Sequence, residues 1–140
     1  MIRLATKKDI PRLLELFNSN ANLREDDSFK YKEHDIKEDI TNPNMIFVYI
    51  QDKKIVGAQL VEFWKIAKWC YLRVLIVDKK YRERGIGTRL IKHVEKEAKK
   101  HGIRLFSFFS EKGDKEMHKL AKKLNYKKGK ECFCFSKGKS

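Results

Sequence analysis

Cysteine and proline are scarce in this chain of 140 residues, with three cysteines and two prolines. An odd number of cysteines without Cys-x-x-Cys spacing argues against a disulfide scaffold and against a four-ligand zinc centre, so we expect no metal site. We expect Cys70, Cys132 and Cys134 to pack in the interior as small apolar side chains.

Long apolar runs are also absent from the sequence. No stretch approaches the roughly 18 apolar residues of a membrane span. The opening "MIRLATKKDIPRLLELF" is interrupted by charges, whereas a secretory signal peptide carries an unbroken apolar block. We therefore expect a cytoplasmic protein without a membrane partner. A hydrophobic fraction of 41% at this length predicts a single domain over residues 1–140.

Basic residues are abundant, and they outnumber acidic residues by 33 to 19, which gives a net charge of +14. Such an excess favours an anionic partner, which would be a nucleic acid, a phosphate-bearing cofactor or an acidic protein. A lysine-rich proteome explains the same composition, because the lysines are spread along the whole chain. The sequence has no compact basic stripe interleaved with aromatic residues, as single-strand binders need, so a nucleic acid is not the favoured partner.

The hydrophobic pattern predicts helices and strands in the order β-α-α-β-β-β-α-β-α-β. The predicted strands cover residues 2–6, 45–52, 54–64, 69–77, 103–109 and 131–136. Thr6 and Asp9 have the spacing of a helix cap, and the predicted helices cover residues 7–17, 31–40, 88–100 and 114–124. This order predicts an α/β or α+β domain built around a mixed sheet.

The segment "DKKYRERGIG" joins a buried strand that ends near Val77 to a helix that begins near Thr88. The first turn of a helix has unpaired amides and attracts anions, and glycines let the backbone approach a ligand closely. Two arginines in the same segment add charge-assisted hydrogen bonds to phosphate oxygens. The segment therefore predicts a pyrophosphate site. A Rossmann fingerprint is excluded because Leu90 stands where the third glycine would be, and no Gly-Lys-Ser/Thr of a Walker loop is present.

The pattern Arg-x-x-Gly-x-Gly, formed by Arg82, Gly85 and Gly87, resembles motif A of the GCN5-related N-acetyltransferase (GNAT) family. The order of elements is similar to that family over nearly the whole chain. The resemblance implies acetyl-CoA as cosubstrate, held where two parallel central strands, here "LRVLIV" and "IRLFSFF", splay apart. Carried over by position, the cofactor-binding residues would be Leu75, Ile76, Val77, Arg82, Arg84, Gly85, Ile86, Gly87 and Thr88.

The resemblance implies a reaction in which a primary amine attacks the thioester of acetyl-CoA directly. The backbone of the strand before the turn would pair with the pantetheine arm, as an added strand would. A backbone amide at the end of that strand, near Ile76 or Val77, would polarise the thioester carbonyl. The acceptor is a small molecule, a polyamine or a protein amine, and the acyl group is acetyl or another acyl group. The late strands of this fold often meet in dimers, so a homodimer is compatible with the sequence.

The catalytic positions depart from the family pattern. The helix "DKEMHKLAKKLNY" is similar to the family's Asn-x-x-Ala-x-x-Phe-Tyr-x-x-Leu-Gly-Phe, but Ala121 stands where a tyrosine usually protonates the leaving thiolate. His118, one turn earlier on the same side of the helix, is a candidate donor or a contact for the substrate. An ordinary surface histidine, with water as the proton donor, is the alternative interpretation.

The general base is equally open. Tyr71 stands roughly where many members of the family have a carboxylate, and Glu62 on the preceding strand is the nearest acidic residue. Strand alternation puts Glu62 on the same face as Leu60 and Trp64, where apolar neighbours favour a raised pKa and a role as base. The alternatives for Glu62 are an exposed residue or a partner of Arg73 across the strands.

The acceptor end offers an acidic cluster and several aromatic residues. The acidic cluster, at residues 25–27, would attract a cationic amine or balance nearby lysines. The aromatic residues that are candidates for an acceptor pocket, although most of them are expected in the core, are Phe29, Tyr31, Phe63, Trp64 and Trp69. Because the usual catalytic groups are missing, a second hypothesis is a weakly active or inactive domain of this fold. Such a domain would bind a nucleic acid or an acidic protein through its basic surface.

Overall fold

The computed structural model describes residues 1–19, 30–41, 44–133, 135 and 137–138. Over these residues the strands are β1 (Ile2–Leu4), β2 (Asn44–Gln51), β3 (Lys54–Trp64), β4 (Trp69–Val77) and β5 (Leu105–Ser107). The helices are α1 (Ile10–Asn18), α2 (Glu33–Asp39), α3 (Ile86–Lys100) and α4 (Lys115–Lys123), with short 3-10 turns at η1 (Lys7–Asp9) and η3 (Lys79–Tyr81). No helix of this described part is long and apolar enough to cross a membrane.

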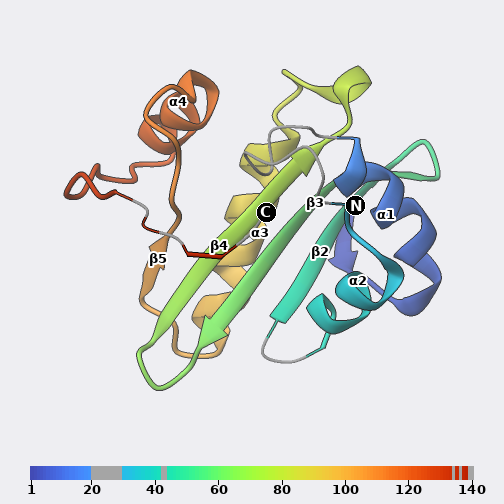
Figure 1. Cartoon of the computed structure of the whole chain (residues 1–140), viewed down its shortest axis with the longest axis horizontal. Coiled ribbons are helices and arrows are strands. Elements are labelled where there is room, and N and C mark those ends of the chain that lie inside the picture. Colours follow the sequence, from blue (N-terminus) through green and yellow to red (C-terminus); the bar gives the residue numbers. More distant parts are fainter. Residues whose placement is uncertain (20–29, 42–43, 134, 136, 139–140) are drawn as a thin grey trace.

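The strands form one sheet in the order β1-β2-β3-β4-β5 (Figure 1). The first three pairings are antiparallel, and the pairing of β4 with β5 is parallel. A mixed sheet with helices on both faces confirms the predicted fold class. β3 and β4 are the two longest strands. β3 is buried on both faces, which explains its nearly continuous apolar sequence.

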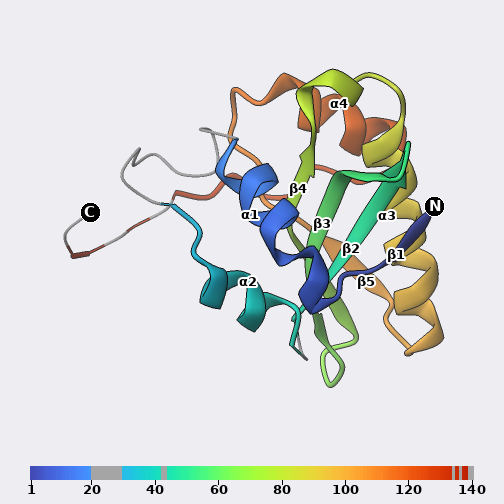
Figure 2. The ribbon, with the colours of Figure 1, turned by 90° about the vertical axis from the view of Figure 1, so that its right-hand side faces the viewer.

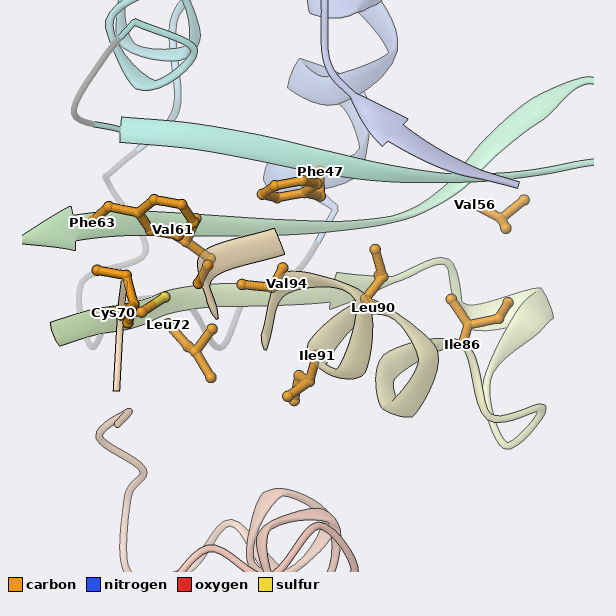
Figure 3. Close-up of a cluster of buried hydrophobic side chains, with 12 residues drawn as sticks. Phe47, Val56, Val61, Phe63, Cys70, Leu72, Ile86, Leu90, Ile91 and Val94 are labelled. Carbon is orange, nitrogen blue, oxygen red and sulfur yellow. The ribbon is translucent and has the colours of Figure 1, made fainter. Parts of the chain in front are cut away.

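Two hydrophobic cores lie on opposite faces of the sheet. Figure 2 shows α1 and α2 on one side of the sheet and α3 on the other. On the α3 side, the buried side chains of Ile86, Leu90, Ile91 and Val94 pack against the strands (Figure 3). On the other side, α1 contributes its own buried stripe of Ile10, Leu13, Leu16 and Phe17. The helical spacing of both stripes is the pattern that predicted these helices.

The entry into α1 matches the predicted cap. The Asp9 carboxylate accepts a hydrogen bond from the Thr6 backbone amide at 2.7 Å, and it also accepts two bonds from the Arg3 guanidinium at 2.7 and 3.0 Å. Arg3 thereby lowers the pKa of Asp9 below its usual value, since the carboxylate form makes these bonds. The first turn after the cap is the 3-10 turn η1, and the α-helix follows it.

The predicted closing strand at residues 131–136 is wrong for the part that the structure describes. Residues 131–133 and 135 are not in a strand, and Phe133 and Phe135 are largely exposed. Alternating apolar residues favour a strand only where a partner edge is available, and β5 at the sheet edge has three residues. Cys70 is buried as predicted, but Cys132 is exposed, and Cys134 lies outside the described residues.

Candidate active site

The segment between β4 and α3 folds as a tight turn that is held by hydrogen bonds to Asp78. The Asp78 carboxylate accepts a hydrogen bond from the Lys80 amide at 3.0 Å, which starts η3. Two residues then have left-handed backbone angles, Glu83 with φ of 62° and Gly85 with φ of 79°. Gly85 caps α3, and a residue without a Cβ adopts that conformation at least cost. The glycine at this position is therefore explained by the turn itself.

The first turn of α3 has free amides. Its first backbone hydrogen bond runs from the Arg89 amide to the Gly85 carbonyl at 3.1 Å. Among the described residues, no backbone or side-chain acceptor pairs with the amides of Ile86, Gly87 and Thr88. The first turn also contains no acidic side chain. Three free amides at a positive helix end are a suitable place for a phosphate group.

Gly87, in the first turn of α3, lies beside side chains of β4 and α4. A Cβ at this position would lie 3.2 Å from Leu75 Cδ2 on β4 and 3.8 Å from Leu120 Cδ2 on α4. The first distance is tighter than ordinary side-chain contacts, so a larger residue would displace Leu75. The missing Cβ therefore lets the start of α3 pack closely against Leu75 and Leu120, so the glycine at this position is explained by packing.

Both arginines of the predicted motif have partners within the turn. The Arg82 Nε donates to the Val77 carbonyl at 3.1 Å, and the Arg84 guanidinium lies over the Tyr81 ring, 5.1 Å from its centroid. A third arginine, which the sequence analysis did not single out, lies in the first turn of α3. The Nη1 of Arg89 donates to the Tyr49 hydroxyl at 3.0 Å. The sequence signal for Arg89 was its place directly after Thr88, at the predicted start of the helix.

Asp78 connects this turn to α1. Its carboxylate lies 2.8 Å from Arg12 Nη2, and the Arg12 Nε donates to the Ile55 carbonyl at 2.9 Å. The Lys80 amide, and after it the Arg12 guanidinium, lower the pKa of Asp78 below its usual value. The pair of Arg12 and an ionised Asp78 therefore connects α1, the start of β3 and the end of β4.

The edge of β4 that faces β5 is open over most of its length. β5 pairs with residues 69–71 of β4, and in the described structure residues 72–77 have no strand partner on that edge. Figure 1 shows the chain after β5 running away from β4 toward α4. The two parallel strands therefore diverge, as the resemblance implied. Apart from the Val77 carbonyl, which accepts a hydrogen bond from Arg82 Nε, the backbone groups that residues 72–77 direct to this edge are available to an extended ligand.

A β-bulge lies in the middle of β4. Leu60 pairs with Val74 and Val61 pairs with Leu72, so Arg73 is an extra residue between two register partners. The side-chain amide of Gln59 donates to the Leu60 carbonyl at 3.0 Å and to the Val74 carbonyl at 2.9 Å. Gln59 is 1% exposed, so it satisfies two carbonyls at the bulge from inside the protein. Bulges of this kind redirect a strand and the side chains that it carries.

The bulge brings Arg73 between two carboxylates. Its Nη1 lies 3.3 Å from Glu62 Oε1 on β3 and 3.4 Å from Asp39 Oδ1 at the end of α2. Asp39 is 8% exposed, and burial raises its pKa, although the charge of Arg73 opposes the shift. Of the two alternatives left for Glu62, partner of Arg73 is correct.

The structure brings two of the three predicted catalytic residues together. Glu62 and Tyr71 are direct register partners on neighbouring strands. His118 lies on α4 and is exposed, and no contact joins it to Glu62 or Tyr71 in the part of the chain that the structure describes. Leu120, two residues further on, faces the core, and residues two apart point to nearly opposite sides of a helix. Tyr71 and His118 remain predictions without further support from their contacts.

The fold places the candidate acceptor residues in different environments. Phe63 faces α3 and belongs to the core, which is the alternative expected for most of these aromatic residues. Tyr31 packs against Phe17 with a ring separation of 5.0 Å. Trp64 and Trp69 stack on each other on the opposite face from α3, beside Glu62. Residues 25–27 and Phe29 lie outside the described residues.

A strand, glycine turn and helix with this open edge are the features of an acyl-CoA-dependent transferase fold. The model of the acetyltransferase (GNAT) family matches residues 10–126 of the chain. The match includes β2 to β5, the turn and α4. The chain therefore belongs to the acetyltransferase (GNAT) family, as the resemblance of the turn indicated.

Solved structures of acetyltransferases have the same fold. An aminoglycoside acetyltransferase, meta-AAC0020, from an uncultured soil metagenomic sample matches with a TM-score of 0.82 at 18% identity, over 100% of this chain and 96% of that one. AAC(6')-Iy, in complex with a CoA-containing bisubstrate analogue, matches with a TM-score of 0.81 at 16% identity, over 99% and 97%. The ribosomal-protein-S18-alanine N-acetyltransferase from Escherichia coli matches with a TM-score of 0.74 at 17% identity, over 89% and 75%.

Proposed function

We propose that this protein is an N-acetyltransferase that transfers the acetyl group of acetyl-CoA to a primary amine. The observation that carries the proposal is the continuous path from the open edge of β4 to the free amides of α3, with Gly87 at the junction. A main-chain edge followed by an anion site suits an extended ligand that ends in phosphates. The family membership supports the same ligand.

The residues that would bind acetyl-CoA follow from this path. The backbone of Leu75, Ile76 and Val77 would hydrogen-bond the pantetheine arm, because their other edge is already paired with β3. The amides over residues 84–88 would hold the pyrophosphate. Arg82 and Arg84 would add positive charge from the turn, since both lie on its exposed side. Acetyl-CoA supplies the acetyl group as a thioester.

The acceptor amine must lose a proton before it attacks. A primary amine has a pKa of about 10.4, so most of it is protonated at neutral pH. Glu62 is the better of the two candidate bases, because it is a carboxylate at the bulge with Tyr71 beside it. Ala121 provides no proton for the leaving thiolate, so water or His118 would supply it.

Membership of the family supports a primary amine as the class of acceptor. The similar structures include enzymes named for aminoglycosides and for an alanine of a ribosomal protein, and these acceptors differ greatly in size. The identity of the acceptor must therefore be inferred from the residues of this chain.

A coupled assay of CoA release tests the proposal. Purified protein is incubated with acetyl-CoA and a panel of primary amines, and the released thiol is measured against a control without amine. We expect amine-dependent release of CoA and an acetylated product of matching mass. Release of CoA that no amine on the panel increases, from a protein that binds acetyl-CoA, would contradict the proposed transfer.

A further inference from the structure

Four aromatic rings lie in contact on the face of the sheet opposite α3. Trp64 stacks on Trp69 with a ring separation of 6.1 Å, and Trp69 stacks on Tyr71 at 5.7 Å, with angles of 27° and 13° between their planes. Phe109 meets Tyr71 edge-on at 5.7 Å. The Trp69 Nε1 donates a hydrogen bond to the Ser107 hydroxyl on β5, which fixes the central ring. We call these four residues the aromatic platform.

The aromatic platform is not part of either core. Trp64 is 52% exposed and Phe109 is 73% exposed, although both are large apolar side chains. Neither core cluster contains any of the four rings. Large aromatic side chains that stack with one another and remain open to solvent are typical of ligand sites rather than of packing.

The platform lies directly beside the carboxylates at the bulge. Tyr71 is the register partner of Glu62, and such partners have Cβ atoms about 5 Å apart. Glu62 and Asp39 share the single guanidinium of Arg73, so two carboxylates face one cation. This excess of negative charge lies within a protein of net charge +14. An apolar surface next to local negative charge suits a molecule with a flat apolar part and a cationic part.

We propose that the aromatic platform binds the ring of an arylalkylamine acceptor, with the amine directed to Glu62. This inference rests on the proposed function and specifies its acceptor. The separation of Tyr71 and Glu62 sets a short linker of about two carbons between ring and amine. Stacking on the tryptophans positions the ring, and the faces of the platform rings also attract the ammonium group. A linear polyamine would leave the platform uncovered.

The two tryptophans of the chain both belong to the platform, so intrinsic tryptophan fluorescence reports on this site alone. The protein is titrated with phenethylamine, with hexylamine as an aliphatic amine of similar size, and with 3-phenylpropionate as an aryl anion. We expect saturable fluorescence changes, with phenethylamine bound about 3- to 10-fold more tightly than hexylamine and 3-phenylpropionate more weakly than both. The same order is expected in kcat/KM for acetyl transfer.

Variants separate stacking from general apolar binding. Trp64→Leu removes the exposed end of the platform and keeps Trp69 as the reporter. We expect it to reduce the preference for phenethylamine over hexylamine to less than about twofold. Leu4→Ala removes a side chain with a similar exposure of 49%, on β1, and should leave the preference unchanged. Equal binding of the two amines by the wild type, or an unchanged preference in Trp64→Leu, would overturn the inference.

The readouts also distinguish this inference from the proposed function. A protein that acetylates aliphatic amines as well as aryl amines would keep its proposed function and lose the platform as an acceptor site. A protein that binds phenethylamine on the platform but does not bind acetyl-CoA would keep the platform and lose the transferase function. Tighter binding of spermidine than of phenethylamine would replace the arylalkylamine by a polyamine.

Discussion

The Nη1 of Arg73 lies 3.3 Å from Oε1 of Glu62 on the neighbouring strand. Arg73 reaches this position because a β-bulge makes it an extra residue of β4. Glu62→Gln keeps the size of the side chain and removes its capacity as a base. We expect kcat to fall about 100-fold or more, as for the loss of a general base, with the affinity for acetyl-CoA unchanged. Steady-state kinetics and calorimetry measure the two quantities.

Tyr71→Phe is the matched control for this prediction. It removes a hydroxyl beside Glu62 and keeps the ring of the platform. If Tyr71→Phe lowers kcat and Glu62→Gln does not, the assignment of the base to Glu62 is wrong.

Gln59 is expected to stabilise the bulge. Its side-chain amide donates to the carbonyls of Leu60 and Val74, and the side chain is fully buried. Gln59→Met has a similar volume and leaves both carbonyls without that donor. We expect the free energy of unfolding in urea to fall by about 1–3 kcal/mol. A variant as stable as the wild type would show that the bulge does not depend on this side chain.

The ion pair of Asp78 and Arg12 predicts a dependence of stability on pH. The pKa of Asp78 is lowered in the folded protein by the Lys80 amide and the Arg12 guanidinium. Its contribution is therefore complete above the ordinary carboxyl pKa, and it is lost as the pH falls through the lowered value. Asp78→Asn should cost roughly 1–2 kcal/mol at neutral pH and should weaken the loss of stability as the pH falls below the ordinary carboxyl pKa of about 3.9.

Urea unfolding at a series of pH values measures this contribution. Glu111→Gln is a suitable control, because Glu111 is exposed and makes no ion pair with any described residue. If the free energy of unfolding falls equally steeply with decreasing pH in Asp78→Asn and in the wild type, the role of the ion pair is contradicted.

Cys70 should be unreactive in the folded protein. Its side chain is fully buried on the α3 side of the sheet, and burial, with the nearby charge of Glu95, raises the pKa of the thiol to about 12. The thiolate is the reactive form, so native Cys70 should not react with a thiol reagent at neutral pH. Cys70→Ala should leave the number of reactive thiols unchanged in the folded protein and lower it by one in denaturant. A decrease in the folded protein would show that Cys70 is accessible.

The turn and the central strands could be predicted from the sequence, because each depends on local patterns. Gly85 and Gly87 follow an apolar strand at the start of a helix, although α3 begins at Ile86, two residues before the predicted start near Thr88. The alternation that placed Glu62 on the face of Leu60 and Trp64 is correct as well. These signals require no knowledge of distant contacts.

The environment of Glu62 could not be predicted in the same way. Asp39 is 34 residues from Arg73 in sequence, and the two meet only because the fold brings the end of α2 within reach of the Arg73 guanidinium. The bulge itself has no marker in "WCYLRVLIV", although the polar Gln59 within the apolar strand "VGAQLV" was a usable signal of a buried hydrogen-bonding site. The closing strand was predicted wrongly because the alternation of apolar residues describes only the segment itself. It does not show whether a strand edge is available to pair with that segment.

The most direct test of the account is a calorimetric titration with acetyl-CoA of the wild type, Thr88→Glu and Thr88→Gln. An acidic residue in the first turn of a helix is compatible with folding, so Thr88→Glu adds negative charge at the proposed pyrophosphate site without breaking α3. We predict stoichiometric binding by the wild type, binding at least about tenfold weaker in Thr88→Glu, and a small effect in Thr88→Gln. A folded wild-type protein that does not bind acetyl-CoA, or equal affinity in all three proteins, would contradict the central claim.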